Sequence, residues 1–548
     1  MDEPTIWKLI DIYFKENPQT LVRHHIDSYN QFIEEDIFQI FRDMNPLKVR
    51  LSMDESLQDF RTKCDLYIGG KDGTRVYFGK PIIYDPKNSH YMYPNEARLR
   101  EMTYGITIHY DIDVEYTRVL GPDDIPTEVD ENGYMIFSSM GKEENRENPE
   151  DPRPVREKLT PSEMAKLREN AGKTIDRNRQ LVKVRLEKVY LGKFPIMVQS
   201  NVCILNNMPR LMRFALGECK NDLGGYFIID GKEKAVVPQE AFGDNMINVS
   251  KSNNEKYAYT LEMKSISENI SKPKRTLSLR VMNDTASAVK QNIGVFIPNT
   301  GEVPIPLFVV FRALGILSDR DIISFCTLQQ PEYTPVSFLP YIDACIHDAS
   351  AILTQEEALE YITRTVKGRS HWRAHQVIAD FLLPHIGELE YLEKAYYLGY
   401  LANRLLSVTV GIEPPTDRDS YKYKRVSLIG PLLKNLFSDY YQMQLKYINL
   451  QIETIHVYNE RAYHDIGVLL HEKYDDIFQK RMVEEGIRKA FKGNWGAYSH
   501  TKIVGVLQDL NRLSHNSMMN HLRKTNLPMD SSLKIVAPRV LHGSQWGI

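Results

Sequence analysis

The sequence has no apolar run long enough to cross a membrane and no closely paired cysteines. Its most apolar stretch, residues 305–317, carries Arg312 in the middle and is shorter than the roughly 20 residues that a transmembrane helix needs. The N-terminus opens with Asp2 and Glu3 and lacks the basic and then apolar segment of a secretion signal. The five cysteines are scattered, without a C-x-x-C pair. We therefore expect no membrane insertion, no secretion, reduced thiols and no zinc site.

Sequence motifs of self-contained enzymes are missing as well. There is no G-x-x-x-x-G-K-[ST] phosphate loop, no H-E-x-x-H, no G-x-S-x-G and no dinucleotide fingerprint after a predicted strand. The fifteen histidines do not combine with the cysteines at metal-ligand spacing. The adjacent pair His24 and His25 falls in a predicted helix, where we expect surface or packed side chains. We predict no catalytic residue and no metal site in this chain.

One predicted strand carries three carboxylates on a single face. Residues 106–116 alternate apolar and polar side chains, as a half-buried strand does, and this places Asp111, Asp113 and Glu115 together. Carboxylates in this arrangement are able to bind a metal ion. The more frequent arrangement is the solvated side of an edge strand, and this is our prediction.

Length, composition and charge indicate a multidomain globular protein. With 548 residues the chain is too long for one core, and its 42 % apolar and 26 % charged residues are ordinary for a folded protein. The net charge of −3 is unevenly distributed, because residues 485–548 contain nine Lys or Arg against three acidic residues. This segment of +6 leaves −9 for the remainder and favours contact with phosphate at one place. A solvated basic face is the alternative.

Hydrophobic periodicity predicts several further elements. Apolar residues at helical spacing predict an amphipathic helix over residues 21–33 and buried helices over 388–406 and 432–457. Residues 224–231 predict a strand that enters a hairpin at an Asp-Gly turn. Between residues 121 and 173 prolines and charges dominate, so we predict a flexible surface insertion that buries too little apolar area to stay ordered.

Seven motifs follow one another in the order of a known family. Six of them are L-V-R with I-D-S-Y-N-Q-F-I (21–33), Y-P-N-E-A-R-L-R with M-T-Y (93–104), G-E-C (217–219), G-G-Y-F-I-I-D-G-K-E-K (224–234), V-F-R-A-L-G-I with S-D (310–319) and D-R-D, K-R and G-P-L-L (417–433). The seventh spans residues 493–548 and includes G-N-W-G, H-L-R-K-T-N-L-P, P-R, L-H and a final W-G-I. This order resembles the second-largest subunit of multisubunit DNA-directed RNA polymerases of the RNA polymerase II type.

The resemblance implies an α+β multidomain fold. Residues 1–246 and 412–484 would form the protrusion, residues 247–411 a lobe inserted into it, and residues 485–548 the fork region, truncated before the hybrid-binding domain. In the family, protrusion and lobe form one jaw of the DNA cleft, and the fork lies beside the RNA–DNA hybrid. Residues 508–524 also resemble the bacterial β-subunit segment that lines the rifamycin pocket, although several residues differ and drug sensitivity does not follow.

Polar and basic residues of the fork region are the predicted nucleic-acid contacts. Arg523 and Lys524 would neutralise phosphates without reading sequence. Gln508 and Asn511 would hydrogen-bond to the nucleic-acid backbone or to the 2′-hydroxyl that distinguishes RNA. For Arg512 a structural salt bridge is the alternative. The complete predicted set is Gln508, Asn511, Arg512, Arg523, Lys524, Thr525, Asn526, Lys534 and Arg539. Packing is the expected role of His521, and residues 525–532 would be the loop that blocks downstream duplex.

The resemblance also implies that the chain acts within an assembly. Mg²⁺ would be bound mainly by the largest subunit, and none by this chain, which alone would be inactive as a nucleotidyltransferase. The expected partners are the largest subunit, the remaining C-terminal half of the second-largest subunit, the DNA template and the RNA–DNA hybrid. We expect the enzyme in the nucleus, or in a viral factory or virion if the source is a large DNA virus. The alternative function is a non-catalytic polymerase- or nucleic-acid-binding protein that modulates transcription.

The family continues beyond the last residue of this sequence with C-P-x-E-T-P-E-G and the hybrid-binding domain. Three explanations stay open for this difference. The chain is a gene fragment or truncated form, or one half of a split subunit, or the segment upstream of an intein, since the family's next residue is the cysteine that splicing needs.

Overall fold

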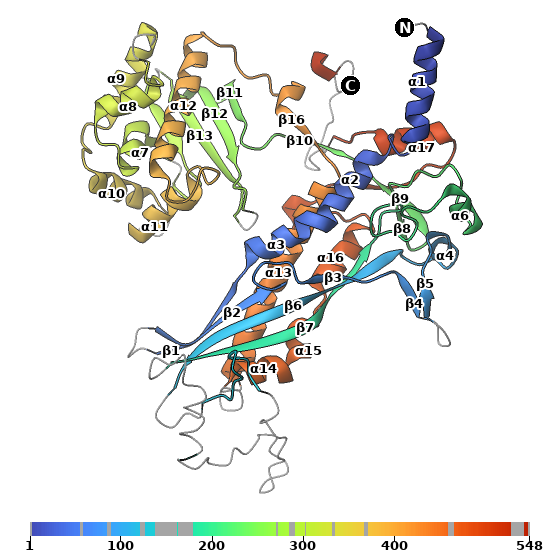
Figure 1. Ribbon diagram of the computed structural model, residues 1–548. Helices are drawn as coiled ribbons and strands as arrows, with labels where there is room; N and C mark the ends of the chain where they lie inside the picture. Colours follow the sequence, from blue (N-terminus) through green and yellow to red (C-terminus); the bar gives the residue numbers. More distant parts are fainter. Residues whose placement is uncertain are drawn as a thin grey trace. The chain divides into compact units, whose positions relative to one another are not determined.

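The computed structural model divides the chain into two compact units. Unit 1 comprises Met1–Glu240 and Val426–Lys534, and unit 2 comprises Ala241–Arg425 and Ile535–Ile548. Figure 1 shows both units, coloured along the chain. The structure describes residues 3–54, 59–84, 89–120, 126–136, 162, 179–269, 272–283, 291–301, 303–330, 335–366, 371–458, 465–527 and 542–545. Most of the insertion predicted over residues 121–173 therefore lies outside the described residues, and so do Lys534 and Arg539.

An antiparallel sheet forms the centre of unit 1. Its strands are β1 (Leu47–Asp54), β2 (Asp59–Ile68), β3 (Val76–Phe78), β6 (Gly105–Val119) and β7 (Arg179–Pro195). Strand β6 pairs with β2 and β3 along one side and with β7 along the other. The alternation predicted for residues 106–116 is present, because Ile106, Ile108 and Tyr110 are buried. The prediction of an edge strand was wrong, because β7, which follows far along the chain, covers the second side of β6.

Helices pack against this sheet and enclose an aromatic core. They are α2 (Arg23–Gln31), a π-helical turn η1 (Phe32–Asp36), α3 (Ile37–Met44), α13 (Ile429–Tyr458), α14 (Ile466–Glu472), α15 (Tyr474–Phe478) and α16 (Met482–Ala490). The ring of Phe41 lies 5.0 Å from that of Tyr441 and 6.0 Å from that of Phe437, both edge to face. Edge-to-face pairs of this kind contribute beyond their buried area. The helices predicted over residues 21–33 and 432–457 are confirmed, since α2 with η1 and α13 occupy these segments.

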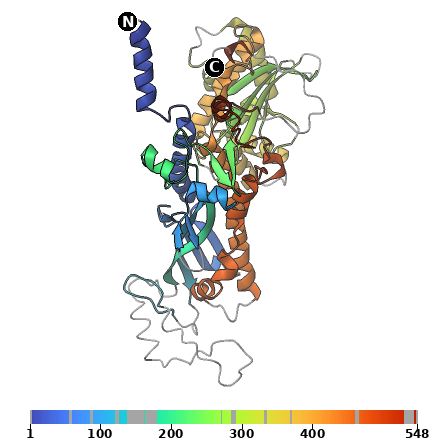
Figure 2. The same ribbon diagram turned by 90° about the vertical axis from the view of Figure 1, so that its right-hand side faces the viewer.

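Helix α1 (Glu3–Glu16) differs from the other helices because none of its residues is buried. Its exposed side chains include Trp7 and Tyr13. Both Figure 1 and Figure 2 show α1 projecting from the rest of unit 1.

A small three-stranded sheet in unit 1 carries the predicted hairpin. Strands β8 (Phe227–Ile229) and β9 (Lys232–Val236) pair directly, and β17 (Leu507–Asp509) adds to the free side of β9. Asp230 and Gly231 link β8 to β9 with φ angles of 47° and 76°. Two positive φ values in a two-residue connection are typical of the type I′ turn that Asp-Gly favours. The hairpin prediction is therefore confirmed. Around this sheet lie β4 (Ile82–Tyr84), β5 (Ser89–Tyr91), α4 (Pro94–Leu99), α6 (Arg210–Ala215) and α17 (His515–Arg523).

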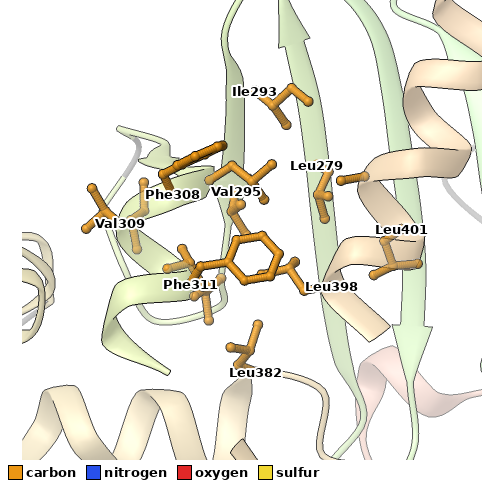
Figure 3. Close-up of a cluster of buried hydrophobic side chains, with 14 of the residues drawn as sticks. Leu279, Ile293, Val295, Phe308, Val309, Phe311, Leu382, Leu398 and Leu401 are labelled. Atoms are coloured by element: carbon orange, nitrogen blue, oxygen red, sulfur yellow. The ribbon is translucent and has the colours of Figure 1, made fainter. Parts of the chain in front are cut away.

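Unit 2 is a sheet with helices over one face. The strands β11 (Ile247–Lys251), β12 (Tyr257–Ser265), β13 (Arg275–Met282), β14 (Ile293–Phe296) and β15 (Ile305–Pro306) are antiparallel and in sequence order. The helices are α7 (Leu307–Ala313), α8 (Asp319–Cys326), α9 (Leu339–Asp348), α10 (Gln355–Thr365), α11 (His371–Gln376), η5 (Val377–Phe381) and α12 (Tyr391–Val410). Figure 3 shows the core between them, where Val295 and Leu279 of the sheet meet Phe311 of α7 and Leu398 of α12. Two further strands, β10 (Gln239–Phe242) and β16 (Lys424–Ser427), pair with each other.

The helix predicted over residues 388–406 is present but shifted and only partly buried. Helix α12 begins at Tyr391 and ends at Val410, where Gly411 adopts a φ of 86°. Leu398 and Leu401 are buried, whereas Leu392 is 48 % exposed. The apolar residues used for the prediction therefore occupy two opposite faces of the helix, and only one of these faces packs on the sheet.

Two charged side chains are buried in unit 2 and donate hydrogen bonds to neighbouring groups, although Nε of Arg312 has no acceptor among the described residues. The Arg312 guanidinium donates to the carbonyl of Ala349 at 2.6 Å and to Asp319 at 2.5 Å. The Lys394 ammonium donates to the carbonyls of Ile378 and Ala379, both at 2.8 Å. Buried charges need such partners.

All five cysteines lie in the described residues, and their thiols are free. In the described part of the chain, no helix combines the length and the apolar character that crossing a bilayer requires.

Candidate nucleic-acid interface

The predicted contact residues 508–526 lie on a segment of unit 1 that is held at both ends. Strand β17 pairs with β9, with Gln508 opposite Ala235. Helix α17 follows and begins after Ser514, whose hydroxyl accepts a hydrogen bond from the Ser517 amide at 3.1 Å. Such an N-cap satisfies an otherwise free amide of the first helical turn. At the end of α17, the ring of His25 bonds to the Leu522 carbonyl through Nε2 at 2.5 Å.

Gln508, His521 and Lys524 form one hydrogen-bonded cluster. The Asn511 amide donates to His521 Nδ1 at 3.1 Å, so the proton of the neutral ring is on Nε2 and points to Gln508 Oε1 at 3.2 Å. The same Gln508 oxygen accepts from Lys524 Nζ at 2.8 Å. Burial and then the charge of Lys524 lower the pKa of His521, which keeps the ring neutral. The structure therefore brings Gln508, Asn511 and Lys524 together, and His521 is the packed residue that orders them.

Arg512 is engaged by carboxylates of unit 1. Its Nε donates to Glu233 Oε2 at 2.7 Å and its Nη2 donates to Glu233 Oε1 at 2.9 Å. The same Nη2 donates to Asp222 at 3.0 Å, and the guanidinium lies 5.0 Å from the ring centre of Tyr226. This geometry is the structural salt bridge that the sequence left as the alternative for Arg512.

The ion pairs of Arg512 belong to a larger network that sequence reasoning missed. Arg98 of α4 donates to Glu218 at 2.8 Å and to Glu233 at 2.9 Å. Its Nη2 also donates to the Tyr226 hydroxyl at 2.7 Å. Glu218 and Tyr226 are buried. The only signal in the sequence was indirect, since these residues lie within the motifs over residues 93–104, 217–219 and 224–234. Those distant motifs meet here and tie the predicted interface to the small sheet.

Arg523 and Lys524 are exposed cations at the end of α17. The Arg523 guanidinium donates to the Leu21 carbonyl at 3.1 Å, and Lys524 donates to the neutral side chain of Gln508 at 2.8 Å. Within the described ranges, neither side chain forms an ion pair with a carboxylate. Their positive charge is therefore available to an outside anion, as phosphate neutralisation requires.

The remaining predicted residues differ in their exposure. Asn526 is partly buried, and its backbone donates to the Pro238 carbonyl and accepts from the Glu240 amide, both at 2.8 Å. Its side chain donates to Gln239 at 3.0 Å, which makes it a link to the segment that follows β9. Thr525 is exposed beside it. Asn511 is exposed as well, and its side-chain oxygen accepts from the Leu513 amide at 2.9 Å.

The net charge of +6 counted over residues 485–548 overstates the positive field of this segment. Lys492 pairs with Asp230 at 2.8 Å, and Lys489 lies 3.9 Å from Glu485. Arg512 is paired as described above. Lys534 and Arg539 lie outside the described residues. Among the described residues of this segment, Arg488, Lys502, Arg523 and Lys524 are exposed and form no ion pair with a carboxylate, and Arg523 and Lys524 are the two that are adjacent.

The three carboxylates of β6 all have hydrogen-bond or ion-pair partners within unit 1. Asp113 accepts from Arg75 at 2.9 Å and from Arg185 at 2.8 Å. Glu115 pairs with Lys71 at 2.8 Å. Asp111 is buried and accepts from the Tyr77 hydroxyl and from the Lys188 amide. Across the described ranges, no group of three or more His, Cys, Asp or Glu side chains is placed to hold a metal ion.

Comparisons with known proteins place these observations in one context. A sequence model described as RNA polymerase beta subunit matches residues 20–469. The chain is 29 % identical over 567 residues to the DNA-directed RNA polymerase II subunit RPB2 of Schizosaccharomyces pombe, covering 99 % of this chain and 40 % of the relative. It is 29 % identical to the DNA-directed RNA polymerase II subunit 2 of Arabidopsis thaliana, with 99 % and 41 % covered. Identity to the DNA-directed RNA polymerase subunit Rpo2 of Saccharolobus shibatae is 26 %, with 99 % and 39 % covered. The chain thus spans about 40 % of the length of these relatives.

Proposed function

The chain belongs to the RNA polymerase beta subunit family, and from this premise we propose that it serves in DNA-directed transcription as the front portion of a second-largest polymerase subunit. Unit 1 would contain the protrusion and the fork region as far as Lys534, and Ala241–Arg425 of unit 2 would contain the lobe. We take the boundaries between protrusion and lobe from the compact units, in which the first part of unit 1 ends at Glu240 and its second part begins at Val426. Both eukaryotic RNA polymerase II subunits and an archaeal subunit are among the relatives, which supports this role. The eukaryotic relatives further support a nuclear location.

The observation that carries the contact assignment is the pair of exposed cations at the end of α17. Arg523 and Lys524 have no carboxylate partner in the described part of the chain, although α17 itself is packed and capped. Unpaired positive charges attract the phosphate backbone of a nucleic acid. Because α17 is already fixed in the free protein, binding loses little conformational entropy in ordering this segment. Gln508 and Asn511 lie beside them and would supply hydrogen bonds to sugar hydroxyls.

The chemistry of RNA synthesis would take place on another subunit. Two-metal catalysis of nucleotidyl transfer needs carboxylates that hold Mg²⁺. Of the carboxylates on β6, Asp113 and Glu115 form ion pairs with basic side chains, and Asp111 accepts two hydrogen bonds. We therefore propose that this chain binds no Mg²⁺, is inactive alone and acts beside the largest subunit and the remaining length of its own subunit type.

The proposal is tested with Arg523→Ala combined with Lys524→Ala in the polymerase that assembles around this chain. The measured quantity is the slope of the logarithm of the nucleic-acid binding constant of the elongation complex against the logarithm of the salt concentration. In the double variant this slope should be smaller in magnitude by about 2, because two phosphate contacts are lost. The matched control is Lys8→Ala combined with Lys48→Ala, which removes two exposed charges elsewhere on unit 1.

Three results are distinguishable. A reduced slope in the double variant alone supports the contact assignment. An unchanged slope in a functional enzyme removes Arg523 and Lys524 from the interface and leaves the family membership intact. If the chain enters no polymerase and still binds nucleic acid, the alternative of a non-catalytic modulator replaces the proposed function.

A further inference from the structure

Unit 2 contains a recess on the face of its sheet that points away from the helices. Asn248, Glu262, Lys264 and Thr276 line it, and these residues alternate along their strands with the buried core residues. The strand register places Asn248 opposite Glu262 and Lys264 opposite Thr276. These four side chains therefore form a polar floor over β11, β12 and β13.

Two segments beside the sheet form the walls of the recess. One runs through Phe242, Gly243 and Met246, and the other includes Arg418 and Tyr423. The Gly243 amide donates to the Tyr423 carbonyl at 2.8 Å, which joins the two walls. The Arg418 guanidinium lies 4.3 Å from the ring centre of Phe242. Because the walls are tied together, the recess is preformed.

The second wall is also fixed to the edge of the sheet. The Thr416 amide donates to the Val249 carbonyl at 2.8 Å, and the Val249 amide donates to the Thr416 hydroxyl at 3.1 Å. The volume of the recess is about 80 Å³. Since a single water needs roughly 10–15 Å³ on such a measure, the space admits a group the size of an aliphatic side chain.

The polar groups around the recess are incompletely satisfied. The side-chain oxygen of Asn248 is buried and has no donor in the part of the chain that the structure describes. A buried acceptor without a partner costs free energy that an incoming N–H group would recover. Lys264 and Arg418 are exposed at the rim, and within the described residues neither pairs with a carboxylate. Glu262 is the acidic group on the floor, beside Asn248.

We propose that this recess binds an extended peptide segment that carries an aliphatic side chain next to an acidic residue. The aliphatic side chain enters between Phe242, Met246 and Tyr423. A backbone N–H of the peptide donates to Asn248 Oδ1. The acidic side chain pairs with Arg418 or Lys264, while Glu262 disfavours a carboxylate placed deeper on the floor.

A single-stranded nucleic acid fits the same site less well. Its phosphates would suit Lys264 and Arg418, but a base needs an aromatic face for stacking. The Phe242 ring already holds the Arg418 guanidinium, and the other ring of the walls, Tyr423, lies 5.4 Å from Lys422 Nζ. The size of the recess also favours a side chain over a flat ring system. The peptide is therefore the occupant that the geometry supports, and an oligonucleotide is the competing outcome of the test.

The experiment uses the full chain with ¹³C-labelled methionine methyl groups, observed by NMR. The probe is a nine-residue peptide with the central sequence Asp-Leu-Asp, added to about 2 mM so that weak binding is detected. The expected result is a saturable shift of the Met246 methyl resonance. Two control peptides replace the central Leu with Ser, or both Asp residues with Lys. A thymidine oligonucleotide is titrated separately.

Variants separate the proposed contacts from a general charge effect. Arg418→Glu and Lys264→Glu should each weaken the binding of the Asp-Leu-Asp peptide by at least about tenfold. Arg320→Glu reverses an exposed charge on α8 of the same unit and should leave the affinity unchanged. The methyl resonance of Met282 on β13, a residue that does not line the recess, reports whether unit 2 of each variant is folded.

The outcomes either support the assignment or overturn it. A Met246 shift with the Asp-Leu-Asp peptide, absent with both control peptides and weakened in Arg418→Glu, supports the peptide site. No shift at the highest concentration, equal binding of the Lys-containing peptide, or saturable shifts with the oligonucleotide in place of the peptide would each overturn it. Because the site is built from residues of unit 2, whereas Arg523 and Lys524 belong to unit 1, its failure would leave the contact assignment of these two residues unaffected.

Discussion

Arg512 and Glu233 form a two-pronged ion pair, with Nε to Oε2 at 2.7 Å and Nη2 to Oε1 at 2.9 Å. The pair joins the loop before α17 to strand β9, which precedes it by more than half the chain. Glu233 also accepts from Arg98, so one carboxylate fixes two guanidinium groups from different elements. The segment that carries the candidate interface is therefore held in place by ion pairs within unit 1, and the Arg512 charge in these pairs is not available to nucleic acid.

Replacing Arg512 with Ala should therefore destabilise unit 1. The change leaves Asp222, which is 7 % exposed, and Glu233 without one cationic partner each. We expect the free energy of unfolding to fall by about 1–3 kcal/mol. It is measured by urea denaturation, followed through the fluorescence of the buried Trp495 of unit 1. Arg512→Lys should recover part of the loss, since it keeps the charge but not the two-pronged geometry. Arg523→Ala is the matched control, because its side chain is exposed and a change below about 0.5 kcal/mol is expected. Equal losses in both variants would contradict the structural role of Arg512.

His25 should make the stability of unit 1 depend on pH in the acid range. Burial lowers its pKa to about 4. Between pH 4 and the ordinary value near 6.5, the unfolded chain therefore binds more protons at this residue than the folded chain. The free energy of unfolding should rise as pH increases through this range, and the contribution of His25 should be complete above it. The size is on the order of 3 kcal/mol, from 1.36 kcal/mol for each unit of pKa.

The comparison for this prediction is His25→Gln, which does not titrate and retains a side-chain donor toward the Leu522 carbonyl. The difference in unfolding free energy between the two proteins is measured at several pH values from 4 to 7. A difference that stays constant over this range would show that His25 titrates normally in the folded protein.

Local patterns explain which parts of the fold the sequence could predict. The alternation along β6, the period of α13 and the Asp-Gly turn between β8 and β9 depend on residues that are neighbours in the chain. They were predicted and are present. The position of β6 inside its sheet depends on β7, which lies beyond a long intervening segment, and no local pattern reports such pairing. Helix α12 shows a related limit, because its apolar residues do not reveal which face meets the sheet.

The candidate site shows the same division between local and distant information. The basic run at Arg523 and Lys524 was visible in the sequence, and its lack of carboxylate partners in the described residues agrees with an exposed role. For Arg512 the choice between phosphate and carboxylate could not be made, because Asp222 and Glu233 lie hundreds of residues away. The network through Arg98 was missed for the same reason, since ion pairs between distant segments leave no periodic signal.

Lys394 should give unit 2 a distinct pH dependence in the alkaline range. Burial lowers its pKa to about 8 from the ordinary value of 10.5. Between these values the unfolded chain holds more protons at this lysine, so its contribution to the free energy of unfolding should rise with pH. Burial raises the pKa of several tyrosines, whereas in the unfolded chain they titrate near pH 10, so they too make the stability depend on pH. The measured quantity is therefore the difference in unfolding free energy between the native protein and Lys394→Met. That difference should grow in favour of the native protein by about 3 kcal/mol between pH 8 and 10.5, and a flat difference would contradict the lowered pKa.

The left-handed turn before β8 should depend on the absence of a side chain at Gly224. Its φ is +77°, and a Cβ added there would lie 2.5 Å from the Val198 carbonyl oxygen and 2.8 Å from the Gln199 Cβ. Gly133 is a matched control in the same unit, since its φ is +83° but nothing lies within 4 Å of an added Cβ. Both Gly→Ala changes carry the backbone strain of about 1 kcal/mol that an L-residue has at positive φ. Only Gly224→Ala adds a clash with backbone atoms, so its loss of unfolding free energy should exceed that of Gly133→Ala by about 1–3 kcal/mol.

Thermal unfolding of the two variants measures this difference, and equal losses would mean that the loop around Val198 moves aside at no cost. Because this loop leads into the hairpin that carries Glu233, an excess loss at Gly224 should be accompanied by weaker protection of the Arg512 segment from hydrogen exchange.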